Sequence, residues 1–212
     1  HATVCRGLAL PNLCTTTFGM TAQGEHMTYD PHKHHRRSVR LKAYDYTQNG
    51  VYFVTLCSKH GQPIFGHIEN GAMVLNEKGQ IVEREWLQTA VLRPNVKLDT
   101  HQVMPNHFHG PFWIMNTGME TAVPTRQFGQ PQKGALGTII GAFKAAVTYA
   151  INDLRQTKGL SVWQRNYYEQ VIRNERHATA VRHYITNNPT HWEADKLHPN
   201  APPNPFNQSW PR

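Results

Sequence analysis

Cysteine is scarce in this chain of 212 residues: Cys5, Cys14 and Cys57 are odd in number and show no Cys-x-x-Cys spacing. Small secreted domains carry paired cysteines, and structural zinc sites need closely spaced thiolates. The sequence therefore supports neither a disulfide framework nor a thiolate zinc site. We expect a protein of the reducing cytoplasm.

Long apolar runs and phosphate-binding glycine motifs are also missing. No apolar run approaches the ~18 residues of a membrane-spanning helix, and neither Gly-x4-Gly-Lys-Ser/Thr nor Gly-x-Gly-x-x-Gly occurs. The sequence thus disfavours a membrane protein, a nucleotide-hydrolysing motor and a dinucleotide-binding fold. Residues 1–13 make a poor signal peptide, and the missing initial Met suggests a fragment or an extended reading frame.

Acidic residues are few relative to basic ones. Lys and Arg total 22 against 14 Asp and Glu, which gives a formal net charge of +8. A basic protein of this size often binds a polyanion, so we predict a nucleic-acid partner and association with the nucleoid when the protein is bound to DNA. The alternative is a well-solvated basic surface. We expect residues 1–43 to form a flexible basic extension, in which the block over residues 30–42 is either solvated or in contact with phosphates.

The periodicity of the chain predicts strands alternating with helices. Strands are expected over residues 51–57, 97–104, 107–114 and 163–172, and helices over residues 76–92, 134–156 and 174–188. This order predicts an α+β, ferredoxin-like split βαβ fold: an antiparallel sheet with both main helices on one face, followed by an extra C-terminal helix. The domain is predicted to span residues 44–192, followed by a Pro-rich tail over residues 193–212.

Some local features carry expectations of their own. A small hairpin is expected around Glu69-Asn70-Gly71, and a mobile loop over residues 116–133. Pro111 removes a ladder donor, which predicts a sheet edge or a bulge just beyond His109. The first helix is expected to bury an apolar stripe, which consists of Ile81, Val82, Trp86, Leu87, Ala90 and Val91.

Two histidines, His107 and His109, flank Phe108 in the third predicted strand. Because side chains alternate along a strand, both imidazoles point to one face and Phe108 points to the other. Neutral imidazoles side by side can share one divalent cation. The alternative is a pair of ordinary strand histidines.

Tyr184 and Asn188 lie four residues apart in the last predicted helix, so they share a face. If that face meets the histidines, two imidazoles and an amide oxygen can hold Mg²⁺ or Mn²⁺ with open positions. The cation would polarise a phosphodiester, and Tyr184 would attack its phosphorus. The alternative is a half-buried packing tyrosine.

Three separated motifs together resemble one family. They are Met-Pro-Asn-His-Phe-His ending at His109, Trp-Gln-Arg-Asn-Tyr-Tyr-Glu over residues 163–169, and Tyr-Ile-Thr-Asn-Asn-Pro over residues 184–189. They resemble the IS200-like single-tyrosine HUH transposases, and among these the REP-associated tyrosine transposases. The similarity covers roughly residues 36–192. Pro111, Gly141 and the long N-terminus depart from the family pattern.

The resemblance implies a nuclease that cuts and rejoins single-stranded DNA beside foldback hairpins, through a 5′-phosphotyrosine and a divalent metal. It maps the nucleophile onto Tyr184 and the metal ligands onto His107, His109 and Asn188. It leaves the oligomeric state open, because relatives include dimers and monomers. The residues expected to contact DNA are all basic: Arg36, Arg37, Arg40, Lys42, Lys144, Arg165, Arg173 and Arg182.

Alternatives come from the same residues. Tyr167 and Tyr168 are rival nucleophiles, although neither precedes an amide by one helical turn before a helix stop. A domesticated module that binds hairpins without cutting is the second hypothesis. A histidine-triad hydrolase is disfavoured because its third alternating position is Pro111.

Overall fold

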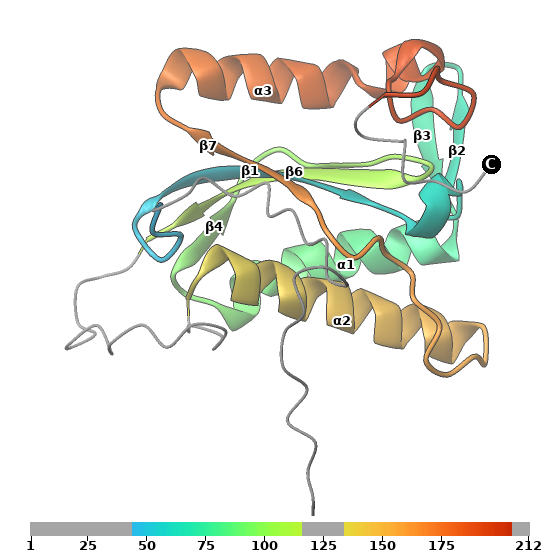
Figure 1. Ribbon diagram of the computed structural model, residues 1–212, viewed down its shortest axis with the longest axis horizontal. Helices are drawn as coiled ribbons and strands as arrows, with labels where there is room; N and C mark the ends of the chain where they lie inside the picture. The colour runs from blue at the N-terminus through green and yellow to red at the C-terminus, as the bar shows by residue number, and fades with distance from the viewer. Residues whose placement is uncertain (1–43, 116–133, 205–212) are drawn as a thin grey trace, which may run out of the picture. The chain divides into compact units, whose positions relative to one another are not determined.

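The structure, a computed structural model, describes residues 44–115 and 134–204 (Figure 1). The mobile loop expected over residues 116–133 and the four N-terminal basic residues Arg36, Arg37, Arg40 and Lys42 lie outside the described residues. The elements in chain order are β1 (Gly50–Cys57), the 3-10 helix η1 (Lys59–Gly61), β2 (Gly66–Glu69), β3 (Ala72–Leu75), α1 (Glu77–Leu92), β4 (Val96–Leu98), β5 (Gln102–Val103), β6 (His107–Ile114), α2 (Leu136–Leu154), β7 (Tyr168–Ile172), α3 (Glu175–Asn187) and the 3-10 helix η2 (Pro189–Ala194).

The main sheet has the strand order β4-β6-β1-β7, and β5 also pairs with β6. Every pairing in it is antiparallel. Strands β1 and β4, which α1 connects, are separated by β6, and this insertion defines a split βαβ arrangement. The predicted α+β, ferredoxin-like fold is confirmed.

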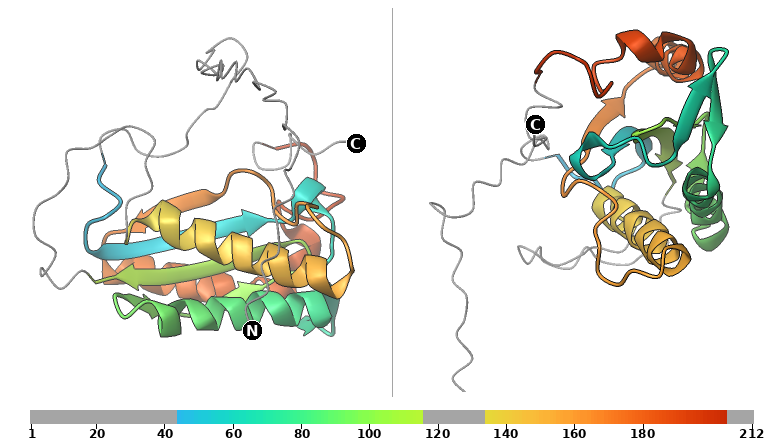
Figure 2. Two further views of the ribbon diagram at one scale, coloured as in Figure 1. Left: turned by 90° about the horizontal axis from the view of Figure 1, so that it is seen from below. Right: turned by 90° about the vertical axis from the view of Figure 1, so that its right-hand side faces the viewer.

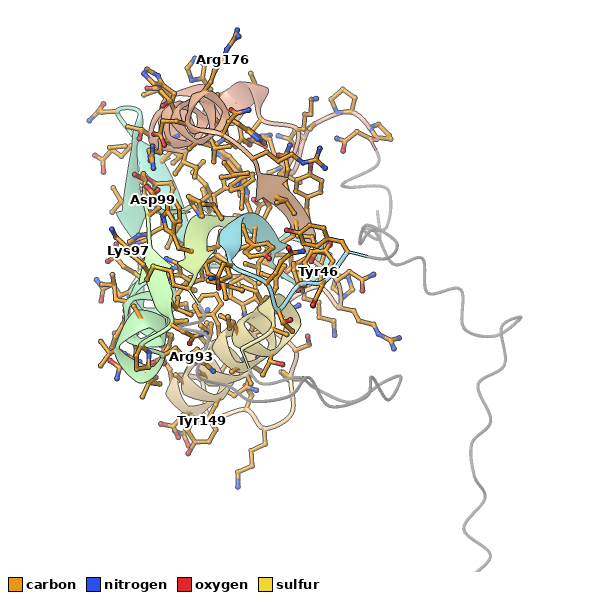
Figure 3. The ribbon with its side chains drawn as sticks, turned by 90° about the vertical axis from the view of Figure 1, so that its left-hand side faces the viewer. Tyr46, Arg93, Lys97, Asp99, Tyr149 and Arg176 are labelled. Carbon is orange, nitrogen blue, oxygen red and sulfur yellow. The ribbon has the colours of Figure 1, made fainter. Side chains whose placement is uncertain are left out.

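The helices lie on both faces of the sheet. Figures 1 and 2 show α1 and α2 on one face and α3 on the other. Figure 3 shows the same separation, with Arg176 of α3 and Tyr149 of α2 pointing outward on opposite sides of the sheet. The two main helices thus share a face, as predicted, and the extra helix covers the opposite face.

Each face of the sheet has its own apolar cluster. Tyr52, Val54 and Leu56 of β1 pack toward α1 and α2, whereas Val51 and Phe53 pack toward α3. Strand side chains alternate between faces, so a strand covered on both sides buries nearly all of its residues. The larger cluster also contains the α2 stripe, which consists of Leu136, Ile139, Ile140, Phe143, Val147 and Ile151.

Side-chain caps fix where the helices begin. The Asn76 side chain accepts from the Lys78 and Gly79 amides at the start of α1, and the Asn174 side chain accepts from His177 at the start of α3. The expected hairpin is β2–β3, with Asn70 and Gly71 at positive φ in its turn. No helix within residues 44–115 and 134–204 has the length and apolar character needed to cross a bilayer.

The apolar stripe predicted for α1 is only partly correct. Ile81, Val82 and Trp86 are buried, but Leu87 and Val91 are 51% and 73% exposed. Leu87 and Val91 lie on the part of α1 that neither α2 nor the sheet covers, so α1 buries a narrower stripe than its apolar residues could supply.

The single strand predicted over residues 97–104 is wrong: the chain forms β4 and β5 with a break between them. Both pieces pair with β6, but residues 99–101 stand opposite residues 110 and 111, so one extra residue bulges out. The Asp99 amide donates to the Pro111 carbonyl at 3.1 Å. Because the N–H and C=O of one residue point to the same side of an antiparallel strand, the missing Pro111 donor faces this break. The predicted bulge is confirmed, whereas β6 is a central strand and not an edge.

Two glycine-to-alanine variants test the packing. A Cβ at Gly110 would lie 2.6 Å from Trp86 Cζ2 and 2.7 Å from the Phe108 ring, whereas one at Gly141 in α2 meets nothing within 4 Å. We expect Gly110→Ala to lower the free energy of unfolding by about 1–3 kcal/mol. Gly141→Ala should raise it by about 0.5–1 kcal/mol, because alanine is the better helix former. Urea unfolding followed by circular dichroism measures both, and an unchanged Gly110→Ala protein would contradict the described core.

Candidate active site

His107 and His109 lie on the face of β6 that α3 covers. Their side chains are buried, with 0% and 1% of their surface exposed, and their Nε2 atoms are 3.0 Å apart. Phe108 points to the opposite face, where its ring packs against Trp86 with centroids 4.8 Å apart. The strand alternation therefore holds two imidazoles together on one side by burying a phenyl ring on the other.

Asn106 fixes the tautomer of His107. The Asn106 amide nitrogen donates to the carbonyl oxygens of Gly61 and Leu197 at 2.9 and 2.6 Å. Its Oδ1 must then accept from Nδ1 of His107, 2.8 Å away. A neutral His107 with a proton on Nδ1 carries a lone pair on Nε2, which faces the second imidazole.

His109 is held by Thr55 of β1, whose hydroxyl lies 2.9 Å from Nδ1 of His109. A hydroxyl can donate or accept, so this contact serves either neutral tautomer of the ring. Phe53 stacks on the same imidazole with centroids 5.5 Å apart. Thr55 therefore leaves His109 free to present either an N–H or a lone pair at Nε2.

Tyr184 approaches the histidine pair from α3. Its hydroxyl oxygen is 3.3 Å from Nε2 of His109, and its side chain is 47% exposed. Partial burial raises the pKa of the Tyr184 phenol, and the nearby Asp195 and Cys57 raise it further. The phenol is therefore protonated at neutral pH, and it can act as a nucleophile only if a base or a cation helps to remove its proton.

Asn188 lies one turn after Tyr184, at the end of α3, and is buried. Its Nδ2 donates to Oδ2 of Asp195 at 2.7 Å, whereas its Oδ1 is buried with no hydrogen-bond partner. Burial lowers the pKa of His107 to about 3, and the nearby Asn188 amide partly offsets that shift. Burial also lowers the pKa of His109, and His107 adds to the effect. Both imidazoles are thus neutral at physiological pH.

Three uncharged atoms are therefore candidate cation ligands: Nε2 of His107, Nε2 of His109 and Oδ1 of Asn188, whose amide interacts with His107. Two nitrogen ligands about 2.1 Å from one octahedral ion stand about 3.0 Å apart when they are cis, so the separation of the two Nε2 atoms fits a shared cation. Within residues 44–115 and 134–204, no group of three or more His, Cys, Asp or Glu side chains is placed so that it could hold a metal ion. A cation here would depend on the amide as its third protein donor.

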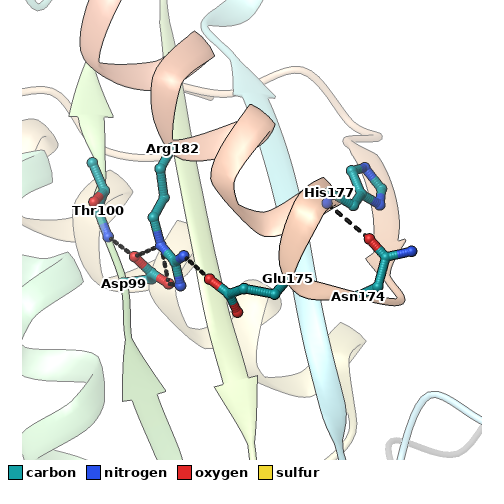
Figure 4. A network of polar contacts seen from close by, with 6 residues as sticks. All are labelled: Asp99, Thr100, Asn174, Glu175, His177 and Arg182. Carbon is teal, nitrogen blue, oxygen red and sulfur yellow. Dashed lines mark hydrogen bonds and ion pairs between the residues drawn. The ribbon is translucent and has the colours of Figure 1, made fainter.

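Arg182, which we predicted to contact DNA, joins α3 to the bulge between β4 and β5. Its guanidinium donates to both carboxylate oxygens of Asp99 at 2.7 to 3.1 Å and to Glu175 at 2.7 Å (Figure 4). Arg182 also lowers the pKa of the Asp99 carboxyl. This network attaches α3, the helix that carries Tyr184, to the sheet.

The other predicted DNA contacts within the described residues lie on α2 and on the segments before and after β7. The Lys144 amine is half-buried and donates to the carbonyl oxygens of Gln164 and Arg165 at 2.6 and 3.3 Å, and burial lowers its pKa to about 8. Arg165, which precedes β7 in the sequence, and Arg173, which directly follows it, are both exposed. Lys144 thus supports the segment that carries Arg165.

The rival tyrosines are placed differently from Tyr184. Tyr167 packs against the cluster between the sheet and the two main helices. Tyr168 lies on the outer strand β7, paired with Thr55 of β1. The Tyr184 hydroxyl, by contrast, lies 3.3 Å from Nε2 of His109.

The sequence did not reveal three supporting residues: Thr55, Asn106 and Asp195. Asn106 had one usable signal, because a metal-binding histidine needs an acceptor for its second nitrogen and Asn106 directly precedes His107. Thr55 and Asp195 carry no such signal, since only strand pairing and the path of the chain after α3 bring them to the site.

The chain shows clear similarity to one curated protein, and no family model matches it. An uncharacterised protein of Haemophilus influenzae is 40% identical over 176 residues, which cover 80% of this chain and 97% of that protein. The chain belongs to the same family as this Haemophilus influenzae protein.

Two solved transposase structures are also similar to this chain. One is a REP-associated tyrosine transposase bound to a REP hairpin, at 16% identity and a TM-score of 0.46, covering 76% of this chain and 77% of that one. The other is a proposed transposase from Deinococcus radiodurans R1, at 15% identity and a TM-score of 0.40, covering 71% and 97%.

Acid should destabilise the protein through its buried histidines. The folded pKa of His107 is about 3 against an ordinary value of 6.5, so the unfolded chain binds the proton first. Stability is then lost as the pH falls from about 6.5 toward 3, by up to about 1.4 kcal/mol per pH unit for each buried histidine. Urea unfolding in EDTA at pH 7.5, 6.0 and 5.0 measures this dependence.

Two histidine variants provide the comparison for that measurement. His107→Gln should flatten the dependence on pH. His67→Gln, at a side chain that is 66% exposed, should keep the wild-type slope. Equal slopes in all three proteins would contradict the neutral, buried state of His107.

Proposed function

We propose that this protein is a single-tyrosine nuclease and strand transferase that cleaves and rejoins single-stranded DNA, as a transposase does. The observation that supports this most directly is the 3.3 Å contact between the Tyr184 hydroxyl and Nε2 of His109, beside a second imidazole at 3.0 Å. A nucleophile beside neutral ligands that could share one cation suits cleavage of a phosphodiester through a covalent intermediate.

In the proposed reaction, the Tyr184 oxygen attacks the phosphorus of a phosphodiester. The bond from tyrosine oxygen to phosphorus forms while the bond from phosphorus to the 3′ oxygen breaks. The leaving strand ends in a 3′ hydroxyl, and the other strand stays attached as a 5′-phosphotyrosine. The phenol loses its proton and the leaving oxygen gains one. Because one phosphodiester bond replaces another, the step needs no nucleotide hydrolysis. Attack by a 3′ hydroxyl on the phosphotyrosine reverses the step.

His107, His109 and Asn188 would hold Mg²⁺ or Mn²⁺, which supplies Lewis-acid activation of the phosphodiester when bound. Asn106 and Thr55 keep the two rings oriented, and the interior position of both rings keeps them neutral. The Tyr184 side chain is 47% exposed, so a DNA strand would reach its hydroxyl from solvent.

We propose DNA with foldback hairpins as the substrate, on the strength of the motifs at residues 104–109, 163–169 and 184–189. The exposed Arg165 and Arg173 can contact phosphates near β7. Lys144 would act by supporting Arg165, and Arg182 by fixing α3, in addition to any contact that each makes with DNA.

A non-cleaving DNA-binding module is the second candidate, favoured by the net charge of +8. Such a module needs basic residues but has no use for a tyrosine hydroxyl held against two neutral imidazoles. The covalent intermediate therefore separates the two candidates.

Tyr184→Phe is expected to abolish the covalent adduct with a labelled single-stranded hairpin in Mn²⁺, by roughly 10³-fold or more, because the attacking oxygen is gone. Tyr168→Phe serves as the matched control and should keep the adduct. Denaturing gels measure adducts, and filter binding measures affinity for DNA. Binding by the wild type without any adduct would support the module.

Mixing two inactive proteins tests whether one chain completes the site. Tyr184 and the histidines meet within a single chain, so Tyr184→Phe and His107→Ala proteins together should form no more adduct than either alone. His107→Ala should retain hairpin binding. Adduct recovery in the mixture would mean that the tyrosine of one subunit acts at the histidines of another.

A further inference from the structure

We propose that Asp195 is a positioning residue that fixes the amide orientation of Asn188, so that Asn188 presents its oxygen, and not its nitrogen, to a divalent cation. This inference rests on the proposed function, because it concerns the cation site of the same nuclease. Asp195 lies beyond the predicted domain end at residue 192, in the segment expected to be a tail.

The chemistry of the contact permits only one orientation. An amide side chain has a donating end and an accepting end of nearly equal size, whereas an ionised carboxylate only accepts. The 2.7 Å contact with Asp195 Oδ2 therefore selects the Nδ2 end of Asn188. The Oδ1 end is left buried with no hydrogen-bond partner. A buried acceptor without a partner needs an explanation, and a cation would provide one.

Asp195 is itself held firmly. Its Oδ1 accepts from the Leu197 amide at 2.6 Å. The carbonyl of Leu197 in turn accepts from Asn106, and Asn106 holds His107. The short segment from Asp195 to Leu197 therefore fixes two of the three donors, Asn188 directly and His107 through Asn106.

The preceding 3-10 helix η2 carries this segment to the site. Its Trp192 is buried, and the Trp192 ring centroid lies 6.0 Å from that of His107. Asp195 also places a negative charge near both His109 and Tyr184. The turn after α3 thus belongs to the site, both by packing and by charge.

The test compares the effect of Asp195→Asn in two backgrounds, with the affinity of the full chain for Mn²⁺ as the readout. Free Mn²⁺ is quantified by electron paramagnetic resonance without DNA. In the wild-type background, an amide at position 195 lets Asn188 rotate, so the affinity should fall about 10- to 100-fold. In the Asn188→Asp background, a carboxylate offers oxygen at both ends, so Asp195→Asn should not weaken Mn²⁺ binding.

A charge effect alone would behave differently, because loss of the Asp195 charge would weaken Mn²⁺ binding by a similar factor in both backgrounds. Equal losses, or no loss in the wild-type background, would overturn the inference. Glu193→Gln is the matched control, since it removes a negative charge from η2 at a side chain that is 89% exposed, and it should leave the affinity unchanged.

Two further readings keep the outcomes separate. Binding stoichiometry gives the competent fraction of each variant, so partial unfolding cannot imitate weaker affinity. If the wild type binds no Mn²⁺, the cation site of the proposed function fails, and this inference fails with it. If the wild type binds Mn²⁺ and the loss is the same in both backgrounds, only the role of Asp195 fails.

Discussion

Burial of strand β6 on both faces is the constraint on which the site depends. Helices α1 and α2 cover one side of this central strand and α3 covers the other, so seven of its eight residues are buried. On one face Phe108 and Phe112 supply apolar surface. On the other, His107 and His109 are removed from water, and each imidazole nitrogen must find a partner within the protein. Asn106 and Thr55 meet that requirement on one side of each ring, which leaves the two Nε2 atoms facing each other.

Helix α3 brings Tyr184 to these nitrogens through attachments along its length. Val181 and Ile185 pack into the smaller apolar cluster with Val51 and Phe53. Arg182 reaches Asp99, which stands where Pro111 prevents regular pairing with β6. The proline that interrupts the ladder therefore coincides with the carboxylate that anchors the tyrosine helix. The break in the sheet at Pro111 thus contains the residue, Asp99, to which Arg182 attaches the helix that carries Tyr184.

The polar atoms of the site are satisfied except at one point. The unpaired Oδ1 of Asn188 lies at the end of a chain of fixed contacts that includes Asp195, Leu197 and Asn106. A site with neutral imidazoles, a protonated phenol and one unused acceptor lacks a positive charge. A divalent cation, as proposed above, would supply that charge.

The sequence by itself determined the parts that depend on local periodicity. The β-branched and aromatic run over residues 51–57 and the helical spacing in residues 136–151 predicted a strand and a helix, and side-chain alternation around Phe108 predicted the shared face of His107 and His109. These features follow from backbone geometry, which neighbouring residues fix among themselves. Tertiary structure alone decided which apolar residues were covered, and it left Leu87 and Val91 exposed. It also split the strand predicted over residues 97–104. Residues 97–104 themselves do not reveal this break, because its cause, Pro111, lies on the neighbouring strand β6. It brought Asp195 to Asn188 after a turn that has no periodic pattern, since such contacts depend on where distant segments meet in space.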